Sequence, residues 1–245
     1  MHNILNIDLG NPMLKHIAKS LIIMSMIFII NSSIAQTMIT ESGIVLDKQW
    51  KITIYQFSKE HLQHSTWGIS HCERNYKLAT KLARLEKLNI DDDVLFAASF
   101  LHDMGLFKPY LVEHSEHAKT SAENVTLILK NTNFPMKKLN DVKGAILSHM
   151  YYADVPDIPI ARVLHDADTL DLLGNIGITR ILSLTTRHRW ATDLSTALKT
   201  IEKFNSELPH KLSTTSAKMM ATSRVAETKL FIKNLKTETN FGASL

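Results

Sequence analysis

An apolar segment from Val94 to Leu101 ends abruptly in His102-Asp103, and the rest of the fold has to accommodate this pair. A segment that is apolar on most sides predicts a helix in the centre of a hydrophobic core. The imidazole and the carboxylate that follow it can both bind a divalent cation. The alternative, from these residues alone, is a solvated His-Asp pair at the end of an ordinary helix.

Three consecutive aspartates, Asp91 to Asp93, stand just before this segment. An aspartate N-cap followed by acidic residues in the first turn is a typical helix start. A calcium loop would instead need alternating ligands, a central glycine and a terminal glutamate, which are absent here. We therefore interpret the three aspartates as capping residues.

Helical periodicity continues through most of the chain, and no β-strand pattern of any length appears. The sequence therefore predicts an all-α fold. The expected helices cover residues 71–85, 94–102, 118–130, 139–150, 160–173, 178–186, 191–204 and 213–235.

The first 35 residues have the pattern of a secretory signal peptide. Basic residues precede the apolar residues 21–30, and a small-polar stretch follows them up to Ala35. The apolar part is shorter than the roughly 20 residues that span a bilayer. We expect cleavage after Ala35 and an exported protein, periplasmic or secreted. The alternatives are a membrane anchor formed by residues 15–35, a misassigned start codon and a cytoplasmic protein.

The remaining chain is expected to form one domain. We predict a linker over 36–49, a helical domain over 50–235 and a frayed tail over 236–245. A hydrophobic content of 44% is enough for one sizeable core. The single cysteine, Cys72, excludes an intrachain disulfide and is expected to pack inside a helix.

The composition does not favour nucleic-acid binding. The net charge is only +4, and the basic residues are scattered along the chain. Aromatic residues make up 7% of the chain and do not alternate with basic ones. We therefore expect no nucleic-acid partner, whereas local positive charge remains available for a small phosphorylated substrate.

Three motifs in a fixed order carry a family resemblance: His71 in the segment 67–74, His102-Asp103 in 100–105, and Asp168 in 166–180. This order resembles the HD superfamily of metal-dependent phosphohydrolases over Trp67 to Arg180, and the last segment looks like one bacterial branch of HD-domain hydrolases. The resemblance implies an HD-type helical bundle with a core at about 67–180. It also implies that His71, His102, Asp103 and Asp168 bind a divalent metal.

The fourth ligand is open on the residues alone, because Asp166 and Asp168 compete for it. Residues two apart on a helix point about 160° from each other, so only one of them faces the metal. The family pattern selects Asp168. Asp171, one turn further on, is expected on the same face as a hydrogen-bond partner of a ligand or of an arginine.

Further residues are candidates for a second metal or for the substrate. His117 and His149 fall where the HD-GYP branch of the family carries two more metal ligands, but no Gly-Tyr-Pro motif follows His149. A cyclic-dinucleotide phosphodiesterase is therefore not expected. Arg74 and Arg180 are candidates for substrate phosphate contacts, with pairing to a buried carboxylate as the alternative for Arg74.

The family resemblance predicts a metal-dependent phosphohydrolase that acts on a phosphate ester or a nucleotide. The ion would activate a water molecule, which Asp103 helps to orient. Nitrogen and oxygen ligands without thiolate suit Mn²⁺, Fe²⁺, Co²⁺, Mg²⁺ or Zn²⁺. The alternatives are a hydrolase or hydratase of a small nitrile or amide, and a non-catalytic binding module. Motifs for a serine nucleophile or a phosphate-binding loop are absent.

Overall fold

Helices form most of the structure, which is a computed structural model that describes residues 37–185 and 192–245. The α-helices are α2 (Gln49–His61), α3 (Ile69–Leu85), α4 (Asp92–Leu101), α5 (His117–Leu129), α6 (Leu139–Leu147), α7 (Pro159–Leu170), α8 (Gly174–Ser183), α9 (Leu194–Glu207) and α10 (Thr215–Glu238). Short 3₁₀ turns lie at Met104–Leu106, Met136–Lys138 and Leu208–Lys211. The all-α expectation is confirmed in its main part.

The predicted signal peptide, and with it the alternative anchor, lies outside the described residues. Among the residues that the structure describes, none of the helices combines the length and the apolar character needed to cross a membrane.

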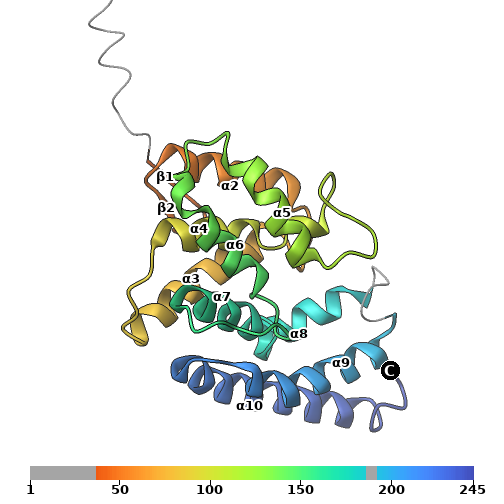
Figure 1. The fold of residues 1–245 in the computed structure, drawn as a ribbon. Helices are drawn as coiled ribbons and strands as arrows, with labels where there is room; N and C mark the ends of the chain where they lie inside the picture. The colour runs from red at the N-terminus through yellow and green to blue at the C-terminus, as the bar shows by residue number, and fades with distance from the viewer. Residues whose placement is uncertain (1–36, 186–191) are drawn as a thin grey trace, which may run out of the picture.

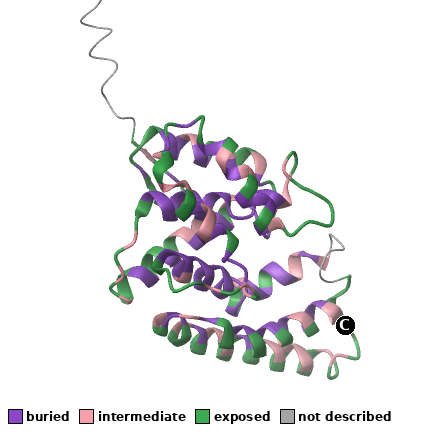
Figure 2. Ribbon diagram, in the orientation of Figure 1, coloured by how far each residue is buried: buried purple, intermediate pink, exposed green. Residues whose placement is uncertain are grey.

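Helix α4 is the centre of the core. Every residue from Asp93 to Leu101 is buried (Figure 2), and the helix contacts α2, α3, α6 and α7. Its N-cap is Asp91, whose side chain accepts hydrogen bonds from the backbone N–H groups of Asp93 and Val94. The predicted capping role is confirmed. A central helix of this kind presents its last residues, His102 and Asp103, to the interior rather than to water.

Helices α3 and α7 pack against each other and against α4, so segments about 95 residues apart in the chain meet in the core. Cys72 on α3 is completely buried, and burial raises the pKa of its thiol well above the ordinary value. Its predicted role as a packing residue is confirmed, since a thiol that stays protonated is a poor nucleophile.

Helix α7 ends at Leu170, three residues earlier than expected, and Asp171 is its C-cap. The chain then turns tightly into α8 through Gly174, which has a φ of +69°. A side chain at this position would be strained by the backbone. Its Cβ would also lie 3.0 Å from side-chain atoms of Arg224 on α10. The early end of α7 places Asp171 beside α3.

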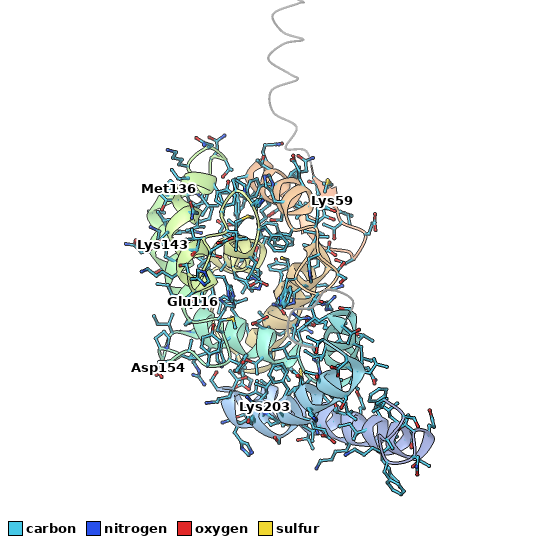
Figure 3. All side chains as sticks on the ribbon, turned by 90° about the vertical axis from the view of Figure 1, so that its right-hand side faces the viewer. Lys59, Glu116, Met136, Lys143, Asp154 and Lys203 are labelled. Carbon is cyan, nitrogen blue, oxygen red and sulfur yellow. The ribbon has the colours of Figure 1, made fainter. Side chains whose placement is uncertain are left out.

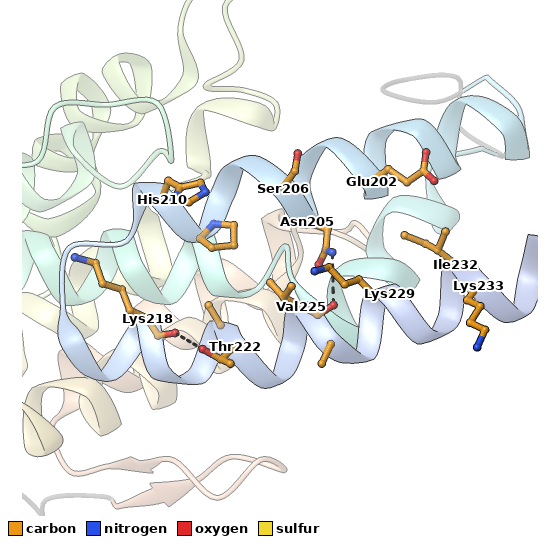
Figure 4. A pocket seen from close by; sticks show the side chains of 13 residues that line it. Glu202, Asn205, Ser206, His210, Lys218, Thr222, Val225, Lys229, Ile232 and Lys233 are labelled. Carbon is orange, nitrogen blue, oxygen red and sulfur yellow. Dashed lines mark hydrogen bonds between the residues drawn. The ribbon is translucent and has the colours of Figure 1, made fainter.

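Helices α9 and α10 lie side by side and form a layer against α7 and α8 (Figure 1). Figure 3 shows this layering from the side, with Lys59 of α2 near the top and Lys203 of α9 near the bottom. A groove of about 890 Å³ runs between α9 and α10 (Figure 4). It contains none of the predicted site residues, so volume alone does not locate the functional site.

The predicted linker is partly ordered. Strands β1 (Met38–Ile39) and β2 (Val45–Leu46) form an antiparallel hairpin whose turn contains Gly43 with a φ of +86°. Ile44 and Leu46 are buried against the helices. The expectation that this segment lacks strands was wrong, because two-residue strands are too short to show an alternating pattern.

Candidate metal centre

Four side chains converge at the inner end of α4, and they are the four that the family resemblance implies. The Nε2 atoms of His71 and His102 are 3.2 Å apart. Asp168 Oδ1 is 3.1 Å from His71 Nε2, and Asp103 Oδ2 is 3.5 Å and 3.4 Å from the two imidazole nitrogens. All four residues are more than nine-tenths buried. We call this set the first cluster.

The hydrogen bonds around the two imidazoles show that the first cluster fits a cation. His71 Nδ1 lies 2.8 Å from Asp171 Oδ2, and His102 Nδ1 lies 2.9 Å from the backbone carbonyl of Ser99. Each Nδ1 therefore carries the proton that it donates, so each neutral ring keeps its lone pair on Nε2. Two lone pairs that face each other at 3.2 Å repel unless a positive charge lies between them. Such fixing of the tautomer by an outer partner is typical of metal-binding histidines.

The pKa of His71 points to the same need for positive charge. Burial and the charge of Arg180 lower it, but hydrogen bonds to Asp103, Asp168 and Asp171 outweigh them and raise it to about 10. A proton on this ring thus supplies the charge that the three carboxylates require. A divalent ion bound to the same nitrogen has to displace that proton.

A second cluster shares Asp103 with the first. Asp103 Oδ1 is 3.3 Å from His117 Nε2 and 3.6 Å from His149 Nε2. Both of these nitrogens are buried and have no hydrogen-bond partner within the described residues. His149 Nδ1 donates to the carbonyl of Ile146, so its lone pair is on Nε2. His102, Asp103 and His149 form a group whose spacing suits a metal ion.

Asp103 thus presents one carboxylate oxygen to each cluster. Desolvation by burial would raise its pKa, but the nearby imidazoles of His102, His117 and His149 hold it well below the ordinary value. The carboxylate stays ionised in a completely buried position. This is the arrangement expected of a ligand that bridges two cation positions.

Gly105 sets how closely the second cluster approaches the first. A Cβ at this position would lie 2.5 Å from the backbone carbonyl oxygen of His117. Its N–H donates to Ser121 Oγ of α5 at 2.8 Å. Gly105 lies within the 3₁₀ turn Met104–Leu106 and does not have a positive φ, so its backbone conformation does not require a glycine. It is the close approach of α5 that requires a glycine.

Asp166 points away from the metal centre, as the helix geometry predicts. Its two carboxylate oxygens accept four hydrogen bonds from the backbone and hydroxyl groups of Ser213 and Thr214, at 2.6 to 3.1 Å. Asp166 therefore anchors the start of α10 to α7. Asp168 is the carboxylate of this pair that lies beside His71.

Asp171 joins both predicted arginines to His71. Arg74 donates from Nε and Nη2 to the two carboxylate oxygens of Asp171, each at 2.8 Å. Arg180 Nη1 lies 3.0 Å from Asp171 Oδ2 and also donates to its backbone carbonyl. Burial would raise the pKa of Asp171, but Arg74, His71 and Arg180 lower it. The structure thus shows the carboxylate partner that the sequence left as the alternative for Arg74.

The two arginines differ in what else they face. Arg180 is 3% exposed, and its Nε is buried without a hydrogen-bond partner in the described part of the chain. It lines a pocket of about 390 Å³ together with Asp103, His117 and Asp168. Arg74 is absent from this lining and borders a separate depression. The position of Arg180 fits the predicted phosphate contact, whereas Arg74 acts on the centre through Asp171.

Sequence reasoning missed Asn75. Its side chain is completely buried, and Nδ2 lies 3.1 Å from Asp168 Oδ1 and 3.2 Å from His71 Nε2. With an ion on His71 Nε2, the amide can donate only to Asp168, which it would then orient. The available signal was the spacing of four residues after His71, which places Asn75 on the same helix face.

Aromatic and apolar side chains form the rest of the pocket wall. They come from the loop before α3, the 3₁₀ turn after α4, the segment after His149 and the turn after α7: Trp67, Leu106, Met150, Tyr151, Tyr152 and Leu172. The hydroxyl of Tyr152 donates to Glu116 at 2.9 Å. The pocket therefore combines an apolar wall with a buried polar floor, as small-molecule sites usually do.

Comparison with known proteins agrees with this geometry. Residues 68–173 match the family model described as the HD domain. The segment that carries the metal centre is therefore similar to the HD domains of metal-dependent hydrolases. The matched segment contains all four residues of the first cluster together with His117 and His149. None of the curated proteins matches the chain.

Solved structures share the HD fold. An HD-superfamily hydrolase from Bacillus thuringiensis is 24% identical, with a TM-score of 0.57 over 78% of this chain and 96% of its own. The protein YpgQ of Bacillus subtilis, solved in complex with ADP, is 20% identical, with a TM-score of 0.59 over 77% of this chain and 97% of its own. At these identities the likeness shows the fold alone.

The two aspartates of α7 provide a matched test of the metal centre. Asp168→Asn should weaken the binding of Mn²⁺ by more than about 100-fold, since loss of an outer partner alone typically costs 10–100-fold. The Asp168→Asn variant should fold like the unchanged chain. Asp166→Asn should keep the metal but lower the free energy of unfolding by about 2–3 kcal/mol, because it removes charge from a buried hydrogen-bonded carboxylate. Metal titration and urea unfolding of both variants measure the two effects, and the opposite pattern would contradict the assignment of Asp168.

Metal binding should release a proton near neutral pH. His71 has a pKa raised to about 10, so its imidazolium must lose a proton before Nε2 binds an ion. Below that pKa the apparent affinity for Mn²⁺ should rise about tenfold per pH unit between pH 6 and 8. Calorimetry in buffers of different ionisation enthalpy would measure about one proton per ion. A binding enthalpy that is the same in every buffer would contradict this expectation.

Proposed function

We propose that the chain is a phosphohydrolase that cleaves a phosphate ester or anhydride of a small molecule at this metal centre. The observation that carries the proposal is the ionised carboxylate of Asp103, shared by two histidine clusters at the floor of a pocket that also contains Arg180. Metal-bridging carboxylates beside an arginine suit phosphoryl groups, because the negative charge on the phosphoryl oxygens has to be neutralised.

The polar residues of the pocket have separate roles in such a reaction. Divalent ions, when bound, supply a Lewis acid that activates water and neutralises phosphoryl charge. Asp103 accepts hydrogen bonds from the attacking water and orients it. Arg180, whose Nε makes no hydrogen bond with any described residue, provides the positive charge that holds a phosphoryl oxygen. Asp171 keeps both His71 and Arg180 in place.

A nucleoside phosphate is the substrate class that we favour. The pocket volume of about 390 Å³ lies in the range of small-molecule sites. Trp67, Tyr151 and Tyr152 provide aromatic faces of the kind on which bases stack. The complex of YpgQ with ADP supports the choice by analogy of fold.

A panel of substrates tests the proposal. The full chain, loaded in turn with Mn²⁺, Co²⁺, Mg²⁺ and Zn²⁺, should release phosphate or pyrophosphate from nucleoside mono-, di- or triphosphates. His102→Ala should lower the rate by more than about 1,000-fold, because it removes a ligand of the ion that activates the water. Lys203→Ala on α9 is the control and should keep full activity. Turnover of a small nitrile or amide, with none of any phosphate compound, would replace the proposed reaction by the alternative one.

We also propose that the protein is exported. The support is the sequence of residues 1–35, with its basic start, short apolar centre and small residues before Ala35. A reaction on phosphate compounds outside the cytoplasm would then be the physiological setting.

Fusion of residues 1–40 to a reporter that is active only outside the cytoplasm tests this proposal. We expect an active reporter whose new N-terminus, found by mass spectrometry, follows Ala35. Replacing two residues of the apolar segment by arginine should abolish the signal, because charge in this segment prevents membrane insertion. A reporter that stays inactive with the unchanged segment would contradict export.

A further inference from the structure

A second depression lies on the side of Asp171 where Arg74 is partly exposed. It has a volume of about 690 Å³ and lies between α3 and α10, with Ile176 of α8 at its edge. None of its lining residues is shared with the pocket at the metal centre. We call it the α3–α10 depression. Four of its lining side chains are cationic: Arg74, Lys77, Lys81 and Arg224.

The positive charge of the α3–α10 depression is not balanced by its carboxylates. Arg74, Lys77 and Lys81 are three and four residues apart, so they share one face of α3, where like charges repel. Asp171 is already engaged by Arg74, Arg180 and His71. Glu73 is the other acidic residue of the lining. Four cations therefore face two carboxylates, and one of these, Asp171, is shared with Arg180 and His71 outside the depression.

Hydrogen-bond donors also remain unused there. Arg74 donates hydrogen bonds from Nε and Nη2 to Asp171, and its Nη1 has no hydrogen-bond partner in the described ranges. Lys77 donates to the backbone carbonyl of Ser42 at 2.6 Å. Lys81 is exposed and makes no hydrogen bond or ion pair with any described residue. These donors come from one helix face and point to a ligand that accepts several hydrogen bonds at once.

Arg224 closes the opposite side of the α3–α10 depression. It is partly buried, and its Nη1 donates to the backbone carbonyl of Leu170. Burial lowers the pKa of its guanidinium, and repulsion from Arg74 lowers it further, against the attraction of Asp171 and Glu227. Two guanidinium groups that repel each other across a partly desolvated space are stabilised by an anion between them.

We propose that the α3–α10 depression binds a phosphate group, either as free phosphate or as part of a small phosphorylated molecule. The planar guanidinium of Arg74 and the ammonium group of Lys81 match tetrahedral oxyanions. The volume leaves room for an organic part beside the phosphate. The site lies outside the proposed hydrolytic pocket and contains no group of either cluster. It is linked to the first cluster through the contacts from Arg74 to Asp171 and from Asp171 to His71.

Calorimetric titration of the full chain after removal of divalent metal tests this proposal. Ribose 5-phosphate and inorganic phosphate are the two probes, and tighter binding of the former would show that the organic part contributes. Lys81→Ala should weaken binding by about tenfold, which corresponds to about 1.4 kcal/mol, and Lys81→Glu should abolish it. Lys203→Ala, an exposed lysine on α9 outside both cavities, is the matched control and should bind normally (Figure 3).

The variants also separate this site from the metal centre. Arg180→Met removes the cation of the hydrolytic pocket and should leave probe binding unchanged. If Arg180→Met abolishes binding while Lys81→Ala does not, the anion occupies the hydrolytic pocket and the proposal is overturned. Absence of binding, or equal weakening by Lys81→Ala and Lys203→Ala, would overturn it as well. Because no turnover is measured, these outcomes are independent of the proposed hydrolysis.

Discussion

The structure depends on a concentration of negative charge in its interior that positive charge has to balance. Three carboxylates, Asp103, Asp168 and Asp171, lie within reach of His71, and all are almost completely buried. Transfer of ionised groups from water into the interior costs several kcal/mol each, even after relaxation of the surroundings. Burial of these three carboxylates is therefore expected only where their charges have a role in binding a cation. The surrounding helices provide the apolar core that stabilises the fold against this cost.

Much of the centre could be predicted from the sequence because its ligands lie next to recognisable local signals. His102-Asp103 ends an apolar helix with a clear N-cap, and the order of motifs indicates His71 and Asp168. Helix geometry also separates Asp166 from Asp168, since it requires only a fixed angle per residue. These inferences need no knowledge of how distant segments meet.

The remaining features depend on tertiary contacts that no local pattern reveals. The contact of Arg74 with Asp171 joins residues 97 apart in the chain. The orientation of Asn75 toward Asp168 follows from the packing of α3 against α7. The hairpin at residues 38–46 is held by burial of Ile44 and Leu46, and its strands are too short for periodicity to appear. The sequence offered a carboxylate partner for Arg74 only as an alternative, and it showed Asn75 and the hairpin only as ordinary polar and apolar residues.

Gly105 has a consequence for how this family of sites can diversify. The backbone carbonyl of His117 lies where the Cβ atom of any other residue at position 105 would be. The short distance between the two clusters therefore requires a glycine at this position. A single added methyl group there would push α5 outward and carry His117 away from Asp103, while leaving the first cluster intact. A centre with two cation positions would thereby become one with a single position. The number of metal ions that such a scaffold holds can thus change through a residue that never touches a metal.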